Sequence, residues 1–394
     1  MTERKNLKIL FIPRWYPGRV DPLNGIFIKR HALSVAIKHQ VAVLYISADS
    51  RMKDKIYDFE FVEEDGLKVC RVYYNNNLPN IPFISSGIKF FRYLRACRKG
   101  IKIINEKFGV PDISHIHVLA RTFFSAYYYK FFYSTPIIIS EQWSGYHAED
   151  GLYKGVFKKM LTRIAVKSAS AVTTVSESLR DAMLAHGLKN NYSVIPNVVD
   201  TKLFYPSAAR TKQGKFILLH VSNLNDRAKN VSGMIRVIGK LSEKRNDFEF
   251  HIAGGGPDED ISMNIAKELN LLNKIVFFDG LKNSAEVAEL MRNADLFLLF
   301  SNYDNMPCVM VESLASGLPV IGSAIHGIKE NVKEGRGILV PPGDETALMN
   351  AIEKAMTTID SFDKTGLHEY AKKNFSYEGV GERFDTIYQK IISK

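Results

Sequence analysis

Short apolar runs alternate with amphipathic segments along most of the chain, and this order limits the folds open to it. Helical patterns separate several of the runs. In the first half the runs that predict strands are Leu7–Trp15, Val41–Ser47, Ile113–His117, Pro136–Ser140, Ala171–Val175 and Tyr192–Pro196. Because a crossover between parallel strands usually carries a helix, this βαβ order predicts an α/β fold with a parallel sheet covered by helices on both faces.

A second series of the same kind follows an irregular stretch. Phe204–Pro206 and the polar run Ser207–Gly214 predict a linker. The strands expected beyond it are Lys215–Val221, Phe248–Ala253, Ile275–Phe278, Leu296–Phe300 and Leu318–Ile321. A chain of 394 residues exceeds the roughly 250–300 residues at which single cores stop growing, so we expect two domains, 1–204 and 205–376. Apolar residues at helical spacing predict a final helix, 377–394, that packs back on the first domain.

The charge balance favours anionic partners. Lys and Arg outnumber Asp and Glu by 53 to 42, which gives a net charge of +11 and suits nucleotides, diphosphates or acidic lipids. No zinc-finger spacing or RNA-reading signature occurs, so we expect no nucleic-acid partner. The three cysteines, Cys70, Cys97 and Cys308, are too scattered for a disulfide framework or a zinc site. That cysteine usage fits a reducing cytoplasm. Neither a secretion signal nor a membrane span is expected, so any membrane contact is expected from the surface, at the inner face.

One strand-to-helix loop carries the clearest chemical signal. Open α/β sheets bind ligands at the carboxyl ends of their strands. The loop 301–307 follows the strand Leu296–Phe300 and opens a helix near Pro307, with Glu312 in its second turn. Free N–H groups at that helix N-terminus suit a diphosphate oxygen or a sugar hydroxyl. The carboxylate of Glu312 can accept two hydrogen bonds from a ribose diol.

The run from Asp304 to Val320 resembles the acidic-x7-Glu signature of the retaining glycosyltransferases of family 4. It includes Pro307 and a small-residue helix that ends in Gly317-Leu318-Pro319. The resemblance implies the GT-B fold, in which two Rossmann-like domains with parallel sheets face each other across a cleft. It also implies that Glu312 binds the ribose, while Asp304 and the loop after it face the donor sugar. The further donor contacts implied there are Asn305, Met306, Pro307, Cys308 and Val309.

Asp304 itself departs from the family pattern, in which Glu is commoner. The shorter side chain loses a reach of about 1.5 Å, one carbon–carbon bond. The replacement of Glu by Asp therefore leaves open which sugar is bound, and it bears less on whether a sugar is transferred.

A second loop, 222–230, offers positive charge. Breaking a sugar–phosphate bond leaves a diphosphate, whose charge must be stabilised by a metal or by fixed cations. Family 4 proteins usually carry Gly-Arg-Leu followed by a Lys here. In this chain Asn223 stands at the place of that Arg, Lys229 matches the Lys, and Arg227 can replace the missing charge. A solvated basic loop is the alternative.

Two further loops complete the expected donor side. Gly254-Gly255-Gly256 lacks the third glycine of a dinucleotide fingerprint, and the resemblance makes Gly255 part of the donor wall. Asp258-Glu259-Asp260 imitates a metal-binding motif, but acids at this place predict the start of a helix. Leu281 lies where such enzymes hold the nucleobase. No metal or cofactor is implied, and the nucleoside diphosphate sugar is a co-substrate.

The first half supplies the other wall. The resemblance places Gly25 near the donor phosphates, and Glu141-Gln142-Trp143 stands where relatives have Glu-His. That His faces the reacting sugar, whereas Gln142 can neither act as a base nor carry a charge. Two alternatives stay open: Gln142 holds a sugar hydroxyl, or activity is weakened or lost. The resemblance thus implies Asp304 and Gln142 as catalytic residues, with His117, Glu141 and Trp143 on the acceptor side. His115 and His117 share one strand face and predict a structural pair, with His117 lining the cleft.

The segment Lys89–Ile104 predicts an amphipathic helix with a basic side. We favour a helix that packs on the core and exposes its basic side to solvent; contact with anionic lipid through 89–104 is the alternative.

These patterns predict a hexosyl- or related glycosyltransferase that moves a sugar from a nucleoside diphosphate sugar to a glycan or polyprenyl-linked acceptor in cell-surface polysaccharide synthesis. The alternatives are a catalytically weak donor-binding pseudoenzyme, a GT-B sugar-nucleotide epimerase and a peripheral membrane scaffold.

Overall fold

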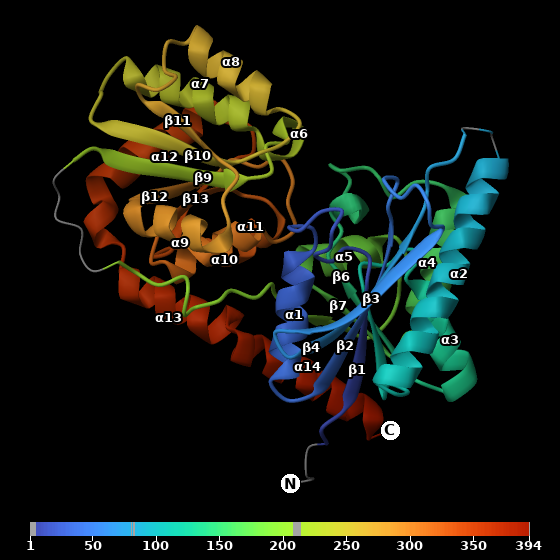
Figure 1. Cartoon of the computed structure of the whole chain (residues 1–394). Coiled ribbons are helices and arrows are strands. Elements are labelled where there is room, and N and C mark those ends of the chain that lie inside the picture. Colours follow the sequence, from blue (N-terminus) through green and yellow to red (C-terminus); the bar gives the residue numbers. More distant parts are fainter. Residues whose placement is uncertain (1–4, 80, 82, 208–213, 394) are drawn as a thin grey trace.

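In the computed structural model, residues 5–79, 81, 83–207 and 214–393 are described, and they form two lobes with one sheet each (Figure 1). The first sheet has eight strands in the order β3-β4-β2-β1-β5-β6-β7-β8. All its neighbours are parallel except the antiparallel pair β3–β4. Its strands are β1 Lys8–Pro13, β2 Gln40–Ala48, β3 Tyr57–Glu64, β4 Leu67–Tyr74, β5 Ile113–His117, β6 Ile137–Glu141, β7 Ala171–Thr174 and β8 Tyr192–Val194.

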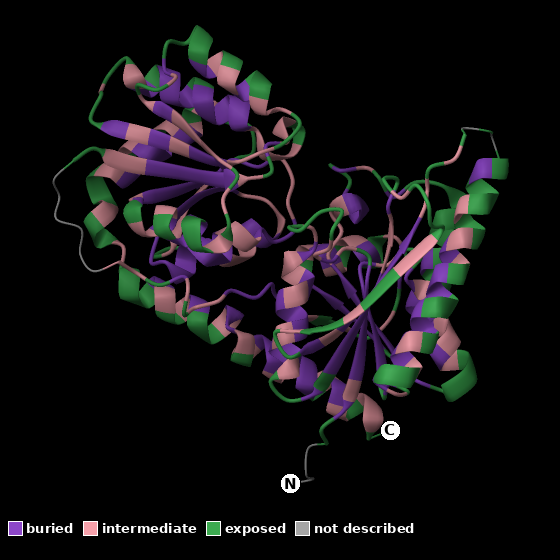
Figure 2. Cartoon of the chain, in the orientation of Figure 1, coloured by how far each residue is buried: buried purple, intermediate pink, exposed green. Residues whose placement is uncertain are grey.

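The second sheet has six strands in the order β11-β10-β9-β12-β13-β14, and all its neighbours are parallel. Its strands are β9 Phe216–Ser222, β10 Phe248–Gly254, β11 Val276–Gly280, β12 Leu296–Leu299, β13 Val320–Ser323 and β14 Gly337–Val340. The prediction of two α/β lobes with parallel sheets is confirmed. In Figure 2 the strands of both sheets are largely buried, while the helices around them expose their outer faces.

Three strands were not predicted. β3 lies at the edge of its sheet and none of its residues is buried, so its sequence YDFEFVEE mixes apolar residues with acidic ones and lacks the apolar run of a central strand. Its neighbour β4 and the short edge strand β14 were missed as well. Most of the predicted linker, residues 208–213, lies outside the described residues.

Helices cover the sheets, and the last one returns to the first lobe. In Figure 1, α13 and α14 run from the second lobe to the first, and Val380, Phe384 and Tyr388 of α14 are buried together with α1. The helices of the first lobe are α1 Ile26–Ala36, α2 Ile84–Lys107, α3 Phe123–Tyr133, α4 Val156–Ser168 and α5 Glu177–Ala185. Those that follow are α6 Asp226–Lys229, α7 Val231–Ser242, α8 Glu259–Glu268, α9 Ser284–Asn293, α10 Cys308–Ala315, α11 His326–Asn331, α12 Glu345–Thr358, α13 Lys364–Phe375 and α14 Tyr377–Ile392.

Helix α2 begins earlier than predicted, and its two halves differ in burial. Its later turns bury Cys97, Ile101 and Ile104 against β2 and β4. Its first turns leave Ile84 and Phe91 exposed. The favoured packing on the core is thus observed for the second half of α2. Among the described residues, no helix combines the length and the apolar composition that crossing a membrane requires.

Buried histidines make the fold sensitive to acid. His31 in the first lobe and His220 in the second are fully buried, and burial lowers the pKa of each to about 4. Below pH 6.5 these two histidines become protonated in the unfolded chain but stay neutral in the folded protein. The unfolding free energy therefore falls as pH falls. We expect each histidine to cost about 2 kcal/mol of unfolding free energy at pH 5.

Guanidinium unfolding at pH 7.5 and pH 5 measures this loss. A His220→Gln variant should lose about 2 kcal/mol less than the parent over the same interval. Equal unfolding free energies at the two pH values would contradict the assignment.

Candidate functional site

The loop between β12 and α10 is held from both lobes. The N–H of Gly327 donates to the Asn305 carbonyl at 2.8 Å, and the Asn197 side chain donates to the Met306 carbonyl at 2.7 Å. Met306 and Pro307 are buried, so their side chains support the loop and only their backbone is available to a donor.

Helix α10 begins where it was predicted, directly after Pro307. The N–H groups of Cys308 and Val309 lie in its first turn, where no intrahelical partner exists. Both residues are partly exposed. This helix end can therefore receive an anion or a hydroxyl.

Glu312 forms a buried ion pair that the sequence did not indicate. Its Oε1 lies 2.6 Å from the Arg30 guanidinium of α1, and the two side chains are only 7% and 8% exposed. Arg30 also donates to the Val198 carbonyl at 3.4 Å. The acid expected to bind a ribose is thus placed at the contact between the lobes, beside the helix that follows Gly25.

Lys229 and Asp304 form a second ion pair, within the second lobe. Their side chains are 16% and 15% exposed, so a ligand can reach both. The structure therefore brings together the two predicted residues of opposite charge that lie 75 positions apart.

The loops after β9 and β10 pack directly on each other. Leu224 donates its N–H to the Gly255 carbonyl at 3.2 Å, and a Cβ on Gly256 would lie 2.7 Å from the Leu224 backbone. Leu281, at the end of β11, is exposed and lies beside Gly255. The predicted donor wall is therefore continuous across the carboxyl ends of three neighbouring strands.

Two predicted donor residues on this side are exposed. The Arg227 guanidinium donates to the Asp150 carbonyl of the first lobe at 3.3 Å. Asn223, earlier in the same loop, is exposed. The neighbouring Asn225 caps α6 through Ala228. Arg227 lies at the junction of the two lobes, where it can meet a donor from either side.

Gly25 occupies a position that no other residue tolerates. Its φ is +72°, and a Cβ would lie 2.3 Å from the Trp15 carbonyl carbon. It ends the β1–α1 loop and immediately precedes the first turn of α1. Because Gly25 has no side chain, only backbone atoms lie at this point of the β1–α1 loop, next to the helix that contacts the second lobe.

Glu141 is a positioning residue, which corrects its predicted place among the acceptor contacts. Its side chain is fully buried. The carboxylate accepts hydrogen bonds from the N–H groups of Gln142 at 2.9 Å, Trp143 at 3.0 Å and Leu119 at 3.1 Å. Burial raises the pKa of Glu141, and these hydrogen bonds oppose that shift. Glu141 therefore fixes the loop that carries Gln142 and has no atom left for an acceptor.

Replacing Glu141 with glutamine should destabilise the fold by about 2 kcal/mol, because an amide NH2 would then face the Leu119 N–H with no acceptor between them. Guanidinium unfolding measures the change. The exposed Glu334→Gln is the matched control and should leave the unfolding free energy unchanged. Equal stability of the Glu141→Gln protein and its parent would show that the buried carboxylate is dispensable.

Gln142 connects both lobes through hydrogen bonds. Its Nε2 donates to Nδ1 of His31 at 3.1 Å, and its backbone carbonyl accepts from Asn305 Nδ2 at 2.7 Å. His31 Nε2 in turn lies 2.9 Å from the Pro196 carbonyl. The Oε1 atom of Gln142 is buried and has no partner among the described residues. The free group of this side chain is therefore a hydrogen-bond acceptor.

His117 does not line a surface, which corrects its predicted place on the acceptor side. It is fully buried, its ring stacks on Phe11 at 4.4 Å, and its nitrogens have no described partner. His115 bonds Tyr388 and Ser140, as a structural histidine does. Trp143, in contrast, is partly exposed.

Sequence reasoning missed three residues at the lobe contact, Arg30, His147 and His326, and it also missed His31, which holds the Gln142 side chain. His147 Nε2 lies 2.6 Å from Asn305 Oδ1, and the rings of His147 and His326 stack at 3.8 Å. Ligand atoms of these two histidines and Glu149 lie within 4.8 Å of one another. The available signal was weak: polar residues on the inward face of α1 mark Arg30 and His31.

Comparison with protein families divides the chain much as the sheets do. The family model described as Glycosyltransferase Family 4 matches residues 35–203, and the family model described as Glycosyl transferases group 1 matches residues 202–373.

Curated relatives match about three fifths of the chain. N-acetyl-alpha-D-glucosaminyl L-malate synthase of Bacillus anthracis is 24% identical over 245 residues, which are 59% of this chain and 62% of that protein. The gpi3 subunit of phosphatidylinositol N-acetylglucosaminyltransferase of Schizosaccharomyces pombe is 25% identical over 238 residues, which are 59% of this chain and 52% of that protein. The chain thus spans less than two thirds of the length of these relatives.

Solved structures match nearly the whole chain. Sucrose-phosphate synthase from Thermosynechococcus elongatus has a TM-score of 0.78 at 19% identity and covers 99% of this chain and 100% of its own. Anabaena HepE in complex with UDP-glucose has a TM-score of 0.71 at 18% identity, with the same coverage. These likenesses establish the GT-B fold.

Proposed function

The chain belongs to the glycosyltransferases of group 1 and family 4, and from this membership we propose that it transfers a hexose or related sugar from a nucleoside diphosphate sugar with retention of anomeric configuration. The observation that carries the proposal is the arrangement around α10: Glu312 and Asp304 each beside a cation, with the free N–H groups of the first turn between them in sequence. These groups suit the three parts of a donor: the cation and the N–H groups suit a diphosphate, Glu312 suits a ribose, and Asp304 suits a sugar.

Each part of the donor has a residue to hold it. The diphosphate lies on Lys229, Arg227 and the N-terminus of α10, the ribose diol bonds Glu312, and the sugar lies between Asp304 and Gln142. In the reaction the bond from the anomeric carbon to the phosphate oxygen breaks and a bond to the acceptor oxygen forms. The acceptor hydroxyl gives its proton to the departing phosphate oxygen. Lys229 stabilises the charge that grows on that phosphate.

We further propose that transfer needs no metal, because Lys229 and Arg227 supply positive charge at the diphosphate. Treatment with EDTA should therefore leave the rate of nucleoside diphosphate release within about twofold of the untreated rate. A rate that falls with EDTA and returns with Mg²⁺ or Mn²⁺ would overturn this part. His147, Glu149 and His326 would then be the first site to mutate.

A thermal-shift screen identifies the donor. Binding to the folded state stabilises it by mass action, by about 2.7 kcal/mol at a ligand concentration of one hundred times Kd. UDP-, GDP- and ADP-sugars should be compared, with UDP-glucose first because HepE was solved with it. One nucleotide should raise the melting temperature and the others should not. No shift with any of the three would contradict the proposed donor site.

Gln142 supports one rival, a donor-binding protein with weak catalysis, since it cannot carry a charge. The partnerless Oε1 favours the active alternative, in which it accepts a hydrogen bond from a sugar hydroxyl. Replacement of Gln142 by leucine distinguishes the two. A transferase should lose most of its turnover with little change in nucleotide affinity, whereas a pseudoenzyme has no turnover to lose.

The acceptor is proposed to be a glycan or a polyprenyl-linked sugar used in cell-surface polysaccharide synthesis, reached from the cytoplasmic face of the membrane. Exposed apolar side chains on α2 and α4 beside basic ones support a membrane surface. A pure membrane scaffold would bind vesicles and no nucleotide, and a sugar-nucleotide epimerase would convert one donor into another without an acceptor.

A further inference from the structure

The first lobe contains a cavity of about 630 Å³ beside the carboxyl ends of β1, β2 and β4. This volume is within the usual range of sites for small organic ligands. Much of its wall is apolar and comes from Ile46, Tyr93, Phe123, Phe124, Phe157 and Leu161. None of the residues expected to hold the donor lines it, so the cavity is a separate site.

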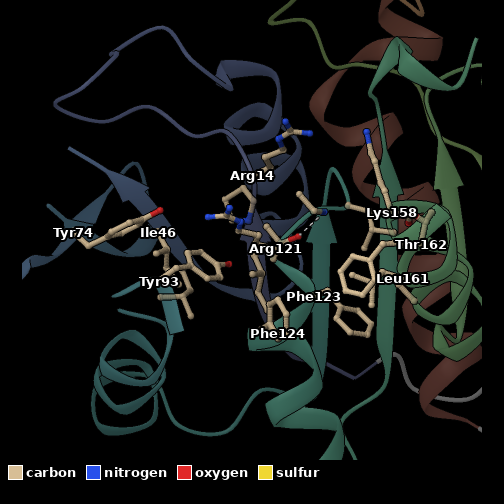
Figure 3. Close-up of a pocket in the computed structure, with 18 of the residues that line it drawn as sticks. Arg14, Ile46, Tyr74, Tyr93, Arg121, Phe123, Phe124, Lys158, Leu161 and Thr162 are labelled. Atoms are coloured by element: carbon tan, nitrogen blue, oxygen red, sulfur yellow. Dashed lines mark hydrogen bonds between the residues drawn. The ribbon is translucent and has the colours of Figure 1, made fainter. Parts of the chain in front are cut away.

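Three cations lie on one side of this cavity: Arg14, Arg121 and Lys158 (Figure 3). In the view of Figure 3, the rings of Phe123 and Phe124 lie on the opposite side. No Asp or Glu is among the described residues that line the cavity, and none of the three cations pairs with a carboxylate in the described part of the chain. Burial lowers the pKa of Lys158 and the positive charge of Arg14 lowers it further, while the more distant carboxylates of Glu141 and Asp150 only partly oppose this shift. An anion bound here would relieve this repulsion.

The cavity is continuous with an exposed apolar surface. Phe157 and Leu161 line it and are also exposed to solvent, Phe157 by 69%. Val156 precedes them on α4 and is 87% exposed. Phe124 contacts Phe90 of α2 edge to face at 5.5 Å, which extends the apolar surface onto that helix. A long apolar chain can therefore lie partly in the cavity and leave it along α4 toward a bilayer.

The cationic side of the cavity adjoins the loop that reaches the second lobe. The Lys158 ammonium lies 3.8 Å from the centroid of the Trp143 ring. Trp143 follows Gln142, whose carbonyl accepts the hydrogen bond from Asn305. A phosphate at the three cations would therefore lie against the loop that carries Gln142, and the group beyond the phosphate would face the donor.

We propose that this cavity binds the apolar chain of a phosphorylated lipid acceptor, with its phosphate or diphosphate at Arg14, Arg121 and Lys158. The proposal rests on the proposed function and narrows its acceptor from a glycan or a lipid-linked sugar to the lipid-linked class. The apolar wall recognises the chain, the cations recognise the phosphate, and an acceptor hydroxyl next to the phosphate projects toward Gln142. A free glycan would use neither the apolar wall nor the cluster of cations.

Calorimetric titration with farnesyl diphosphate, below its critical micelle concentration, tests the site in the full chain. We expect it to bind at least tenfold more tightly than inorganic diphosphate or farnesol, because each of these offers only half of the recognised chemistry. Arg121→Gln should weaken binding about tenfold, and Arg98→Gln on the exposed side of α2 should not. Phe157→Asp should weaken it similarly, while Phe131→Asp, 80% exposed on α3 and outside the cavity, should not.

Three results would overturn the proposal: inorganic diphosphate binds as tightly as the lipid; Phe131→Asp weakens binding as much as Phe157→Asp; or Lys229→Met abolishes binding, which would place the lipid in the donor site. The nucleotide-sugar screen runs beside these titrations on the same protein. If a nucleotide sugar binds but the lipid does not, only the lipid site is contradicted. If the lipid binds but no nucleotide sugar does, the proposed transferase activity is contradicted instead.

Discussion

Replacing Lys229 with methionine should lower kcat/KM for sugar transfer by about 10²–10³-fold, equivalent to about 2.7–4 kcal/mol of transition-state stabilisation. Lys229 is the mostly buried cation beside Asp304, and it is the cation that we propose to stabilise the leaving diphosphate. The loss should appear chiefly in kcat, since this charge is larger in the transition state than in the bound donor. Release of nucleoside diphosphate, followed with a coupled assay, measures it.

Lys240→Met is the matched control. Lys240 is 57% exposed and pairs with Glu345 on α12, so the variant removes the same charge far from the site. It should retain the parental kcat/KM. If the kcat/KM of the Lys229→Met protein lay within about threefold of the parental value, Lys229 would have no role in catalysis.

Replacing Glu312 with glutamine should have two effects. The first is a loss of about 3–5 kcal/mol of unfolding free energy, because Arg30 would be left as a buried charge without its partner. The second is a nucleotide affinity about 10²-fold lower, because the carboxylate that we propose to accept hydrogen bonds from the ribose is gone. Guanidinium unfolding measures the first, and nucleotide titration measures the second.

The double variant Arg30→Met/Glu312→Gln separates the two effects. Removing both charges should restore most of the stability, since an apolar replacement of a buried ion pair is often neutral. It should not restore nucleotide binding. If the double variant binds nucleotide as tightly as the parent, Glu312 serves only to hold the lobes together.

The local signals of the second lobe were strong enough to predict its loops. Glu312, Pro307 and Lys229 follow strands with apolar sequences and stand at fixed spacing, and the structure places them at the carboxyl ends of β9 and β12. Their mutual position depends on the sheet order, in which β9 and β12 are neighbours. Such sites are accessible to sequence reasoning because each residue is set by its own strand and loop.

Contacts between the lobes could not be predicted in this way. Arg30 and Glu312 are separated by 282 positions, and no local pattern joins them. Glu141 was misplaced for a related reason: sequence locates it after a strand but does not say whether its carboxylate turns inward to the N–H groups of its own loop. His117 was misplaced because a polar residue at a strand end can be buried by its neighbours, here the rings of Phe11, His115 and His31.

The cavity of the first lobe was also hidden from the sequence. Its lining residues come from strands, loops and helices between residues 12 and 165, and Arg14, Arg121 and Lys158 read separately as ordinary surface cations. Only the fold brings them to one side of an apolar space. The basic helix that drew attention in the sequence, 89–104, contributes only Tyr93 to that lining.

The most direct measurement of the central claim is a ¹H NMR time course of the donor's anomeric signal, with the nucleotide sugar found in the screen and a lipid phosphate acceptor. We expect the donor signal to fall while free nucleoside diphosphate and a product of the same anomeric configuration appear together. A donor that binds and stays unchanged, or that turns into another nucleotide sugar without releasing nucleoside diphosphate, would contradict the assignment as a retaining glycosyltransferase.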